Sequence, residues 1–153
     1  MKVTMNEGKL SAILPDGFKE LTSEEITARS GKSAKDNWAA SNDEKHIMIN
    51  ITWKNIPLLG KIVDLKKTVS TTQGQIEKVI PTFKKIRDVE TTIASLPAEG
   101  FVYEYQVQNI DMVSQYLLIK ANKQYYAFML IVRKENYNDY LPEFDNFLSS
   151  VVL

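Results

Sequence analysis

The chain has 153 residues, with 19 Lys and Arg against 19 Asp and Glu and no cysteine. Zero net charge disfavours a dedicated nucleic-acid-binding protein, and the lack of cysteine excludes disulfides, thiolate nucleophiles and Cys-ligated metals. No apolar run approaches the roughly 20 residues of a membrane-spanning helix, and the N-terminus lacks the apolar core of a signal peptide. We therefore expect a cytoplasmic protein, or an exported one if a signal or lipoprotein anchor has been removed.

The first part of the chain predicts a strand, a short helix and a hairpin. A short apolar strand is expected from Lys9 to Leu14. Thr22 and Glu25 have the spacing of a capping box, which predicts a helix start. A short strand over residues 37–40 precedes residues 45–55, where apolar and polar side chains alternate. Alternation is typical of a half-buried strand, so these two segments predict a hairpin.

The loop after this hairpin is the strongest candidate for a partner contact. Pro57 and Gly60 are typical of loops, but Ile56, Leu58 and Leu59 are large and apolar. Exposed apolar groups on a protein surface tend to mark interaction sites. We therefore predict that Ile56, Pro57, Leu58 and Leu59 bind a protein partner or a second copy of the chain. The alternative is that the leucines fold under the following helix and belong to the core.

A long helix and an edge strand come next. Asp64 is a suitable N-cap, and apolar residues keep helical spacing as far as Phe83. Weaker alternation over residues 85–95 predicts a strand near a sheet edge. Residues 96–100, which include Pro97 and Gly100, are predicted to turn the chain.

Residues 100–133 contain three β-rich runs separated by two short polar breaks. The breaks are too short for a crossover helix, so the strands must be antiparallel neighbours in a meander. Phe101, Tyr103 and Tyr105 fall on one face of the first run and are predicted to be covered. A closing helix follows, with Pro142 in its first turn and Phe144 at its junction with the sheet.

Two amphipathic helices and a mainly antiparallel sheet predict a single α+β domain over residues 1–153. Three segments resemble the PsbP-like fold, which covers photosystem II PsbP, the Ran-binding Mog protein and bacterial DcrB-type domains. They are residues 14–18 (Leu-Pro-Asp-Gly-Phe), 126–128 (Tyr-Ala-Phe) and the closing segment 140–150. The resemblance implies an accessory, partner-binding protein and transfers no catalytic residue.

Candidate catalytic motifs are few. Gly31-Lys32-Ser33 matches the end of a phosphate-binding loop, but position 26 is Ile where that motif needs Gly. His46 is the only histidine and is predicted on the polar face of its strand. We therefore predict no catalytic residues, no cofactor and no metal site.

Three functions remain open. The first is a non-catalytic binding or assembly module. The second is a carrier of small apolar ligands, with a pocket between sheet and helix lined by Tyr103, Tyr105, Tyr116, Tyr125 and Tyr126; the alternative for these side chains is core packing. The third is an enzyme of unrecognised type. A basic patch containing Lys84, Lys85 and Arg87 is a further possibility, against that of an ordinary solvated surface.

Overall fold

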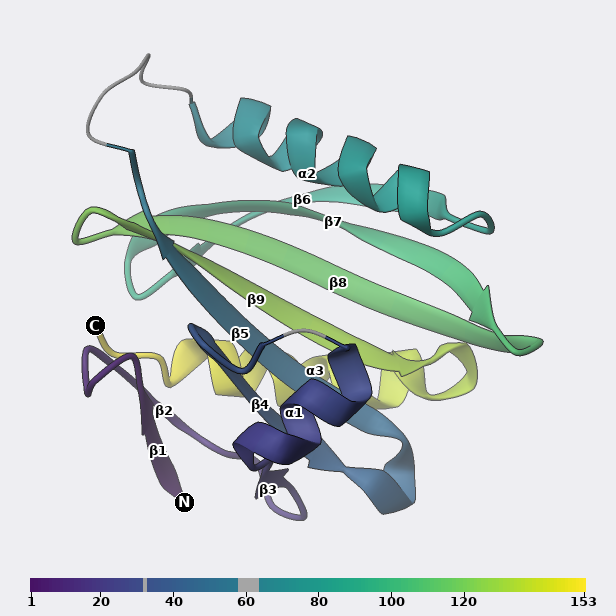
Figure 1. The fold of residues 1–153 in the computed structure, drawn as a ribbon, viewed down its shortest axis with the longest axis horizontal. Helices are drawn as coiled ribbons and strands as arrows, with labels where there is room; N and C mark the ends of the chain where they lie inside the picture. The colour runs from purple at the N-terminus through teal and green to yellow at the C-terminus, as the bar shows by residue number, and fades with distance from the viewer. Residues whose placement is uncertain (32, 58–63) are drawn as a thin grey trace.

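The computed structural model describes residues 1–31, 33–57 and 64–153, and its centre is a seven-stranded antiparallel sheet (Figure 1). In spatial order the strands are β3 (Lys19–Glu20), β4 (Asn37–Asn42), β5 (Ile47–Asn55), β9 (Gln124–Arg133), β8 (Ile110–Ala121), β7 (Leu96–Val107) and β6 (Lys84–Ile93). The predicted meander is β7–β8–β9, and the predicted edge strand is β6. The α+β class is therefore confirmed.

One face of the sheet is covered by α3 (Tyr137–Ser149) and by a hairpin of β1 (Lys2–Met5) and β2 (Leu10–Ile13). Phe144 is 1% exposed in this layer, as predicted, and Phe147 stacks on Trp38 with ring centroids 6.1 Å apart. Backbone hydrogen bonds between Ser11 and Val152 tie the hairpin to the end of the chain. This layer is the larger of the hydrophobic cores.

The opposite face carries α1 (Ser23–Ser30) and α2 (Leu65–Val79). Beneath α2, Phe101 and Tyr103 are buried and Tyr105 is half-buried, which confirms the predicted covered face of β7. Beneath α1 lies a small cluster built around Ala39 of β4. The two faces of the sheet thus have separate cores.

The starts of the helices were predicted from the sequence more accurately than their ends. Thr22 and Glu25 form the predicted capping box, with N–H to oxygen distances of 3.2 and 3.1 Å. The Asp64 carboxylate accepts from the N–H of Lys67 at 2.8 Å, as expected of an N-cap. The predicted end of α2 at Phe83 is wrong, because the helix stops at Val79. Ile80 is extended, which fits the restriction that the following proline places on it.

The predicted turn over residues 96–100 is also wrong, because those residues form the start of β7. The chain turns instead at Ala94 and Ser95, which both have positive φ. A two-residue turn of this kind matches the twist of the flanking strands. Gly100 serves a different purpose: a Cβ there would collide with the backbone carbonyl of Tyr116, so only glycine lets β7 lie this close to β8.

Four short elements complete the description. β1 and β3 were not predicted, and the helical turns Asp43–Lys45 and Lys134–Asn136 precede β5 and α3. The second of these turns makes α3 begin at Tyr137, so Pro142 lies inside the helix and not in its first turn. No helix in the described ranges is long and apolar enough to cross a membrane.

Candidate functional site

The most promising hollow lies between α3 and the edge strand β6. We call it the α3–β6 cleft; its volume is about 350 Å³. It arises where α3 packs on β9 and β7 presents the small residues Ala98 and Gly100 to this face. The cleft is lined by Arg87, Val89, Glu90, Thr91, Thr92, Gln115, Leu117, Leu141, Asp145, Leu148 and Ser149.

The polar end of the cleft is organised by Tyr137. Arg87 donates from Nη2 to the Tyr137 hydroxyl at 3.1 Å, and that hydroxyl donates to Oε1 of Gln115 at 3.2 Å. Gln115 is 4% exposed and Tyr137 is 9% exposed. This chain of hydrogen bonds fixes a guanidinium and an amide at the same end of the cleft.

The Arg87 guanidinium and the Gln115 amide both keep N–H donors that no described residue uses. Within the described part of the chain, no carboxylate forms an ion pair with Arg87. Nε2 of Gln115 likewise has no acceptor there, yet no buried side-chain nitrogen is left unsatisfied, so this amide must reach solvent. Gln115 is one of the residues that line the α3–β6 cleft. These donors are available to an incoming acceptor.

Two acidic residues, Asp145 and Glu90, also line the cleft. Asp145, on α3, lines the cleft, and partial burial raises the pKa of its carboxyl above the ordinary value while nearby Arg87 opposes that rise. The remainder of the lining is mixed: Val89, Leu117, Leu141 and Leu148 are apolar, and Glu90, Thr91, Thr92 and Ser149 are polar or charged. Apolar side chains combined with a few converging polar groups are usual in a binding site.

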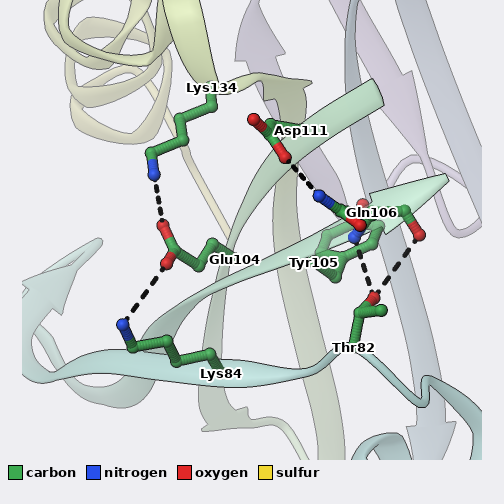
Figure 2. Close-up of a pocket in the computed structure, with 7 residues that line it drawn as sticks. All are labelled: Thr82, Lys84, Glu104, Tyr105, Gln106, Asp111 and Lys134. Carbon is green, nitrogen blue, oxygen red and sulfur yellow. Dashed lines mark hydrogen bonds and ion pairs between the residues drawn. The ribbon is translucent and has the colours of Figure 1, made fainter. Parts of the chain in front are cut away.

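A second hollow lies at the end of the sheet, where β6 and β7 meet the β7–β8 turn (Figure 2). Here Glu104 is bridged by Lys134 at 3.0 Å and by Lys84 at 3.8 Å. Asp111 accepts from Gln106 at 2.9 Å. The charges of this hollow are therefore satisfied by one another, which favours a structural role over ligand binding.

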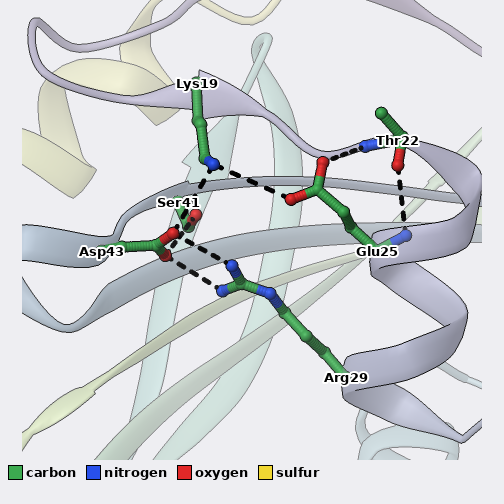
Figure 3. A network of polar contacts seen from close by, with 6 residues as sticks. All are labelled: Lys19, Thr22, Glu25, Arg29, Ser41 and Asp43. Atoms are coloured by element: carbon green, nitrogen blue, oxygen red, sulfur yellow. Dashed lines mark hydrogen bonds and ion pairs between the residues drawn. The ribbon is translucent and has the colours of Figure 1, made fainter.

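A third polar cluster joins α1 to the β4–β5 turn (Figure 3). Arg29 donates two hydrogen bonds of 3.1 Å to the Asp43 carboxylate, and Ser41 adds a third at 2.8 Å. These bonds lower the pKa of Asp43 to about 2. Lys19 lies 3.8 Å from Glu25 and 3.7 Å from Asp43. All of the contacts are internal, so the cluster fastens the short helix to the sheet.

The predicted partner loop is only partly described. Ile56 is half-buried against the core beneath α2, and its N–H donates to the carbonyl of Lys123 at 2.9 Å. Pro57 is exposed, whereas Leu58 and Leu59 lie outside the described residues. The prediction for this loop therefore stays a prediction.

The isolated motifs have structural positions. Gly31 has φ 69° and forms the left-handed C-cap of α1, while Lys32 of the same motif lies outside the described residues. His46 is exposed in the turn before β5 with φ 56°, so its predicted place within the strand is wrong. Over the described ranges, no group of three or more His, Asp or Glu is placed to hold a metal.

The tyrosines are divided between the two faces. Tyr103 lies beneath α2 with its ring centroid 5.0 Å from that of Phe83 and 5.5 Å from that of Phe101. Burial raises the pKa of Tyr103 to about 12. Tyr126 points to the opposite face and bonds to Asn6, so the five tyrosines do not line one pocket.

Most lysines in and around the predicted basic patch form ion pairs in the structure. Lys84 pairs with Glu104, Lys85 with Asp88 at 2.9 Å, and Lys66 with Glu90 at 2.7 Å. These contacts neutralise most of the predicted patch. Arg87 is the member that turns toward the α3–β6 cleft.

The cleft itself was missed at the sequence level. Gln115 was the one residue of the cleft that the sequence pattern could have indicated. It is an amide within the apolar run of β8, and a buried polar side chain needs a hydrogen-bond partner. Arg87 and Gln115 are far from Tyr137 and Asp145 in sequence, and no spacing rule brings these strand residues to α3.

Comparisons with known proteins identify the fold. No family model matches the chain, and no curated protein matches it either. Among solved structures, cyanobacterial PsbP (CyanoP) from Synechocystis sp. PCC 6803 superposes with a TM-score of 0.72 at 11% identity, covering 100% of this chain and 91% of that one. The chain has the PsbP-like fold.

Two further PsbP-like structures agree. The Mog1 protein, in a mutant form, gives a TM-score of 0.63 at 10% identity, with 99% of this chain and 94% of that chain covered. Protein PA94 of unknown function from Pseudomonas aeruginosa gives 0.59 at 14% identity, with 100% and 96% covered. At these identities the similarity shows the fold alone. The predicted resemblance is confirmed at that level.

Proposed function

We propose that this PsbP-like protein is a non-catalytic accessory module that binds a protein partner through the α3–β6 cleft, and that residues 1–153 act as one domain. The observation that carries the proposal is a cleft that combines apolar side chains with the unused donors of Arg87 and Gln115. The PsbP-like fold implies an accessory or partner-binding protein, which supports the same class of function.

The neighbouring sheet edge adds a second reason. β6 lies at the end of the strand order, and an edge strand leaves alternate backbone N–H and C=O groups unpaired. Nearly all of its side chains are exposed. A partner chain can add to such an edge while its side chains enter an adjoining pocket. The cleft and the edge thus form one continuous surface.

The test is to fill the cleft without disturbing the core. Thr91 is an exposed residue of β6 that lines the cleft, so Thr91→Trp should block it. Thr71→Trp, on the exposed side of α2, is a matched control. We expect Thr91→Trp to abolish capture of the partner that the wild type retains from its native host, with Thr71→Trp behaving as wild type. Equal capture by both variants, with unchanged thermal melts, would reject the cleft as the binding site.

The loop containing Ile56, Pro57, Leu58 and Leu59 is proposed as a separate contact. Leu58→Asp combined with Leu59→Asp should weaken self-association or partner binding while the fold stays intact. Sedimentation velocity and a parallel thermal melt test this. A collapse of the melt would place the leucines in the core, and no change in either measurement would leave the loop without a role.

A further inference from the structure

We propose that the α3–β6 cleft binds an extended peptide segment that adds to the edge strand β6 and places an Asp or Glu side chain on Arg87 and Gln115. This inference rests on the proposed function and specifies the chemistry of its ligand. The apolar part of the cleft then receives a hydrophobic side chain of the same segment.

The acidic preference follows from the donors. Arg87 carries a planar fork of N–H groups that suits a carboxylate, and Tyr137 occupies only one of its nitrogens. The amide of Gln115 adds an N–H donor at the same end. A carboxylate placed between Arg87 and Gln115 would accept hydrogen bonds from the unused N–H groups of both. No carboxylate within the described ranges does so in the free protein.

The other charged residues of β6 are each held in an ion pair. Lys85 and Asp88 line the hollow on the α2 side of the sheet and pair with each other, while Glu90 lines both that hollow and the cleft and pairs with Lys66. Arg87 is therefore the one cationic side chain among the residues that line the cleft.

Strand periodicity sets the order of side chains in the ligand. Arg87 and Val89 are two residues apart on β6 and face the cleft together, about 7 Å from each other along the strand. A paired strand would present side chains with the same spacing. The segment is thus predicted to carry an acidic residue and an apolar residue separated by one position. The irregularity in β6 between Lys85 and Arg87 restricts regular pairing to the part of the strand from Arg87 onward.

Asp145 provides an internal check. Its carboxyl faces the same cleft and would repel a bound carboxylate. Removing the Asp145 charge should therefore strengthen the binding of an acidic peptide, whereas removing the Arg87 charge should weaken it. A purely structural role for Arg87 predicts no such pair of opposite effects.

The experiment is a fluorescence-anisotropy titration of an array of labelled seven-residue peptides with the pattern Glu-x-Val at their centre, beside matched Gln-x-Val peptides. We expect the Glu series to bind wild type about tenfold more tightly than the Gln series, the usual scale for a hydrogen bond to a charged group. Arg87→Gln should remove that difference, and Asp145→Asn should increase it roughly threefold at low salt. Lys85→Gln, on the other face of β6, is the control and should leave it unchanged.

Strand addition has its own test. Methylating the backbone nitrogens at alternate positions of the tightest Glu peptide should abolish binding in one register and spare it in the other, because only alternate N–H groups pair with the edge. Equal binding by both methylated peptides would overturn strand addition. Equal binding of Glu and Gln peptides, with partner capture still lost in Thr91→Trp, would overturn the acidic preference alone. Absence of any peptide binding, with capture intact in Thr91→Trp, would overturn both this inference and the proposed function.

Discussion

Arg87 on the edge strand β6 and Tyr137 at the start of α3 are joined by a hydrogen bond of 3.1 Å that reaches across the intervening strand β7. The Tyr137 hydroxyl passes the interaction on to Gln115. One phenol thus sets the distance between the two walls of the α3–β6 cleft and holds the two donors that we assign to the ligand.

Removing this hydroxyl should be measurable. Tyr137→Phe leaves the buried Oε1 of Gln115 without its donor, so we expect a loss of about 1–3 kcal/mol in the free energy of unfolding. Urea denaturation measures it. Tyr140→Phe is the control, because that hydroxyl makes no hydrogen bond to the described residues, and its variant should lie within about 0.5 kcal/mol of wild type. Equal losses in both would contradict the assigned role of Tyr137.

Two glycines should respond oppositely to the same substitution. Gly100→Ala introduces a Cβ that collides with the Tyr116 carbonyl, and should destabilise by about 1–3 kcal/mol or more. Gly74→Ala meets no atom within 4 Å and lies inside α2, so it should stabilise by about 0.5–1 kcal/mol. Thermal or urea melts of the two variants decide this, and a stable Gly100→Ala protein would show that β7 and β8 are not so closely apposed.

Much of the fold could be predicted from the sequence, because the patterns that indicate its elements involve residues close together in the chain. The capping box at Thr22, the cap at Asp64 and the alternation of β5 each depend on residues close in sequence. The errors have a shared cause as well. Residues 96–100 contain Pro and Gly and were predicted as a turn, but Pro97 pairs with Thr92 within the sheet and Gly100 is required by a contact with β8. Such contacts are nonlocal and leave no local pattern.

The proposed binding site was harder to predict from the sequence. The cleft depends on the small side chains of β7, on the position of α3, and on a hydrogen bond between residues 50 positions apart. Gln115 could have been flagged as a polar residue in a buried strand, but its partner could not. The predicted loop, by contrast, was chosen from local composition, and its two leucines lie outside the described residues.

The closing helix should depend on Phe144. This side chain is 1% exposed between α3 and the sheet, and Phe144→Ala is expected to cost about 3–5 kcal/mol. Val152→Ala, at a side chain 61% exposed, should change the free energy of unfolding by less than about 0.5 kcal/mol. A loss below 1 kcal/mol for Phe144→Ala in urea melts would contradict the observed docking of α3.

The contact of α1 with the β4–β5 turn should depend on pH. The folded pKa of Asp43 is about 2, below its ordinary 3.8, because Arg29 and Ser41 donate hydrogen bonds to the carboxylate. Its stabilising contribution is therefore present above pH 4 and is lost as pH falls through about 2. The side chain is 50% exposed, so solvent screening limits this contribution to about 1 kcal/mol or less.

The corresponding measurement compares wild type with Asp43→Asn in urea at several pH values. The stability difference should be present at pH 7 and shrink between pH 4 and pH 2. Glu44→Gln, at the neighbouring exposed carboxylate, is the control. A difference that stays constant over this range would mean that the Asp43 charge contributes nothing.

Site-specific photocrosslinking tests whether a partner occupies the α3–β6 cleft. A photoreactive residue replaces Thr91 in the α3–β6 cleft or, in a control, Val79 at the end of α2, where the side chain is 76% exposed. We expect irradiation in the native host to yield a discrete crosslinked protein species from position 91 and none from position 79, and Arg87→Gln to reduce the yield. Crosslinking from position 79 with none from position 91 would contradict this expectation.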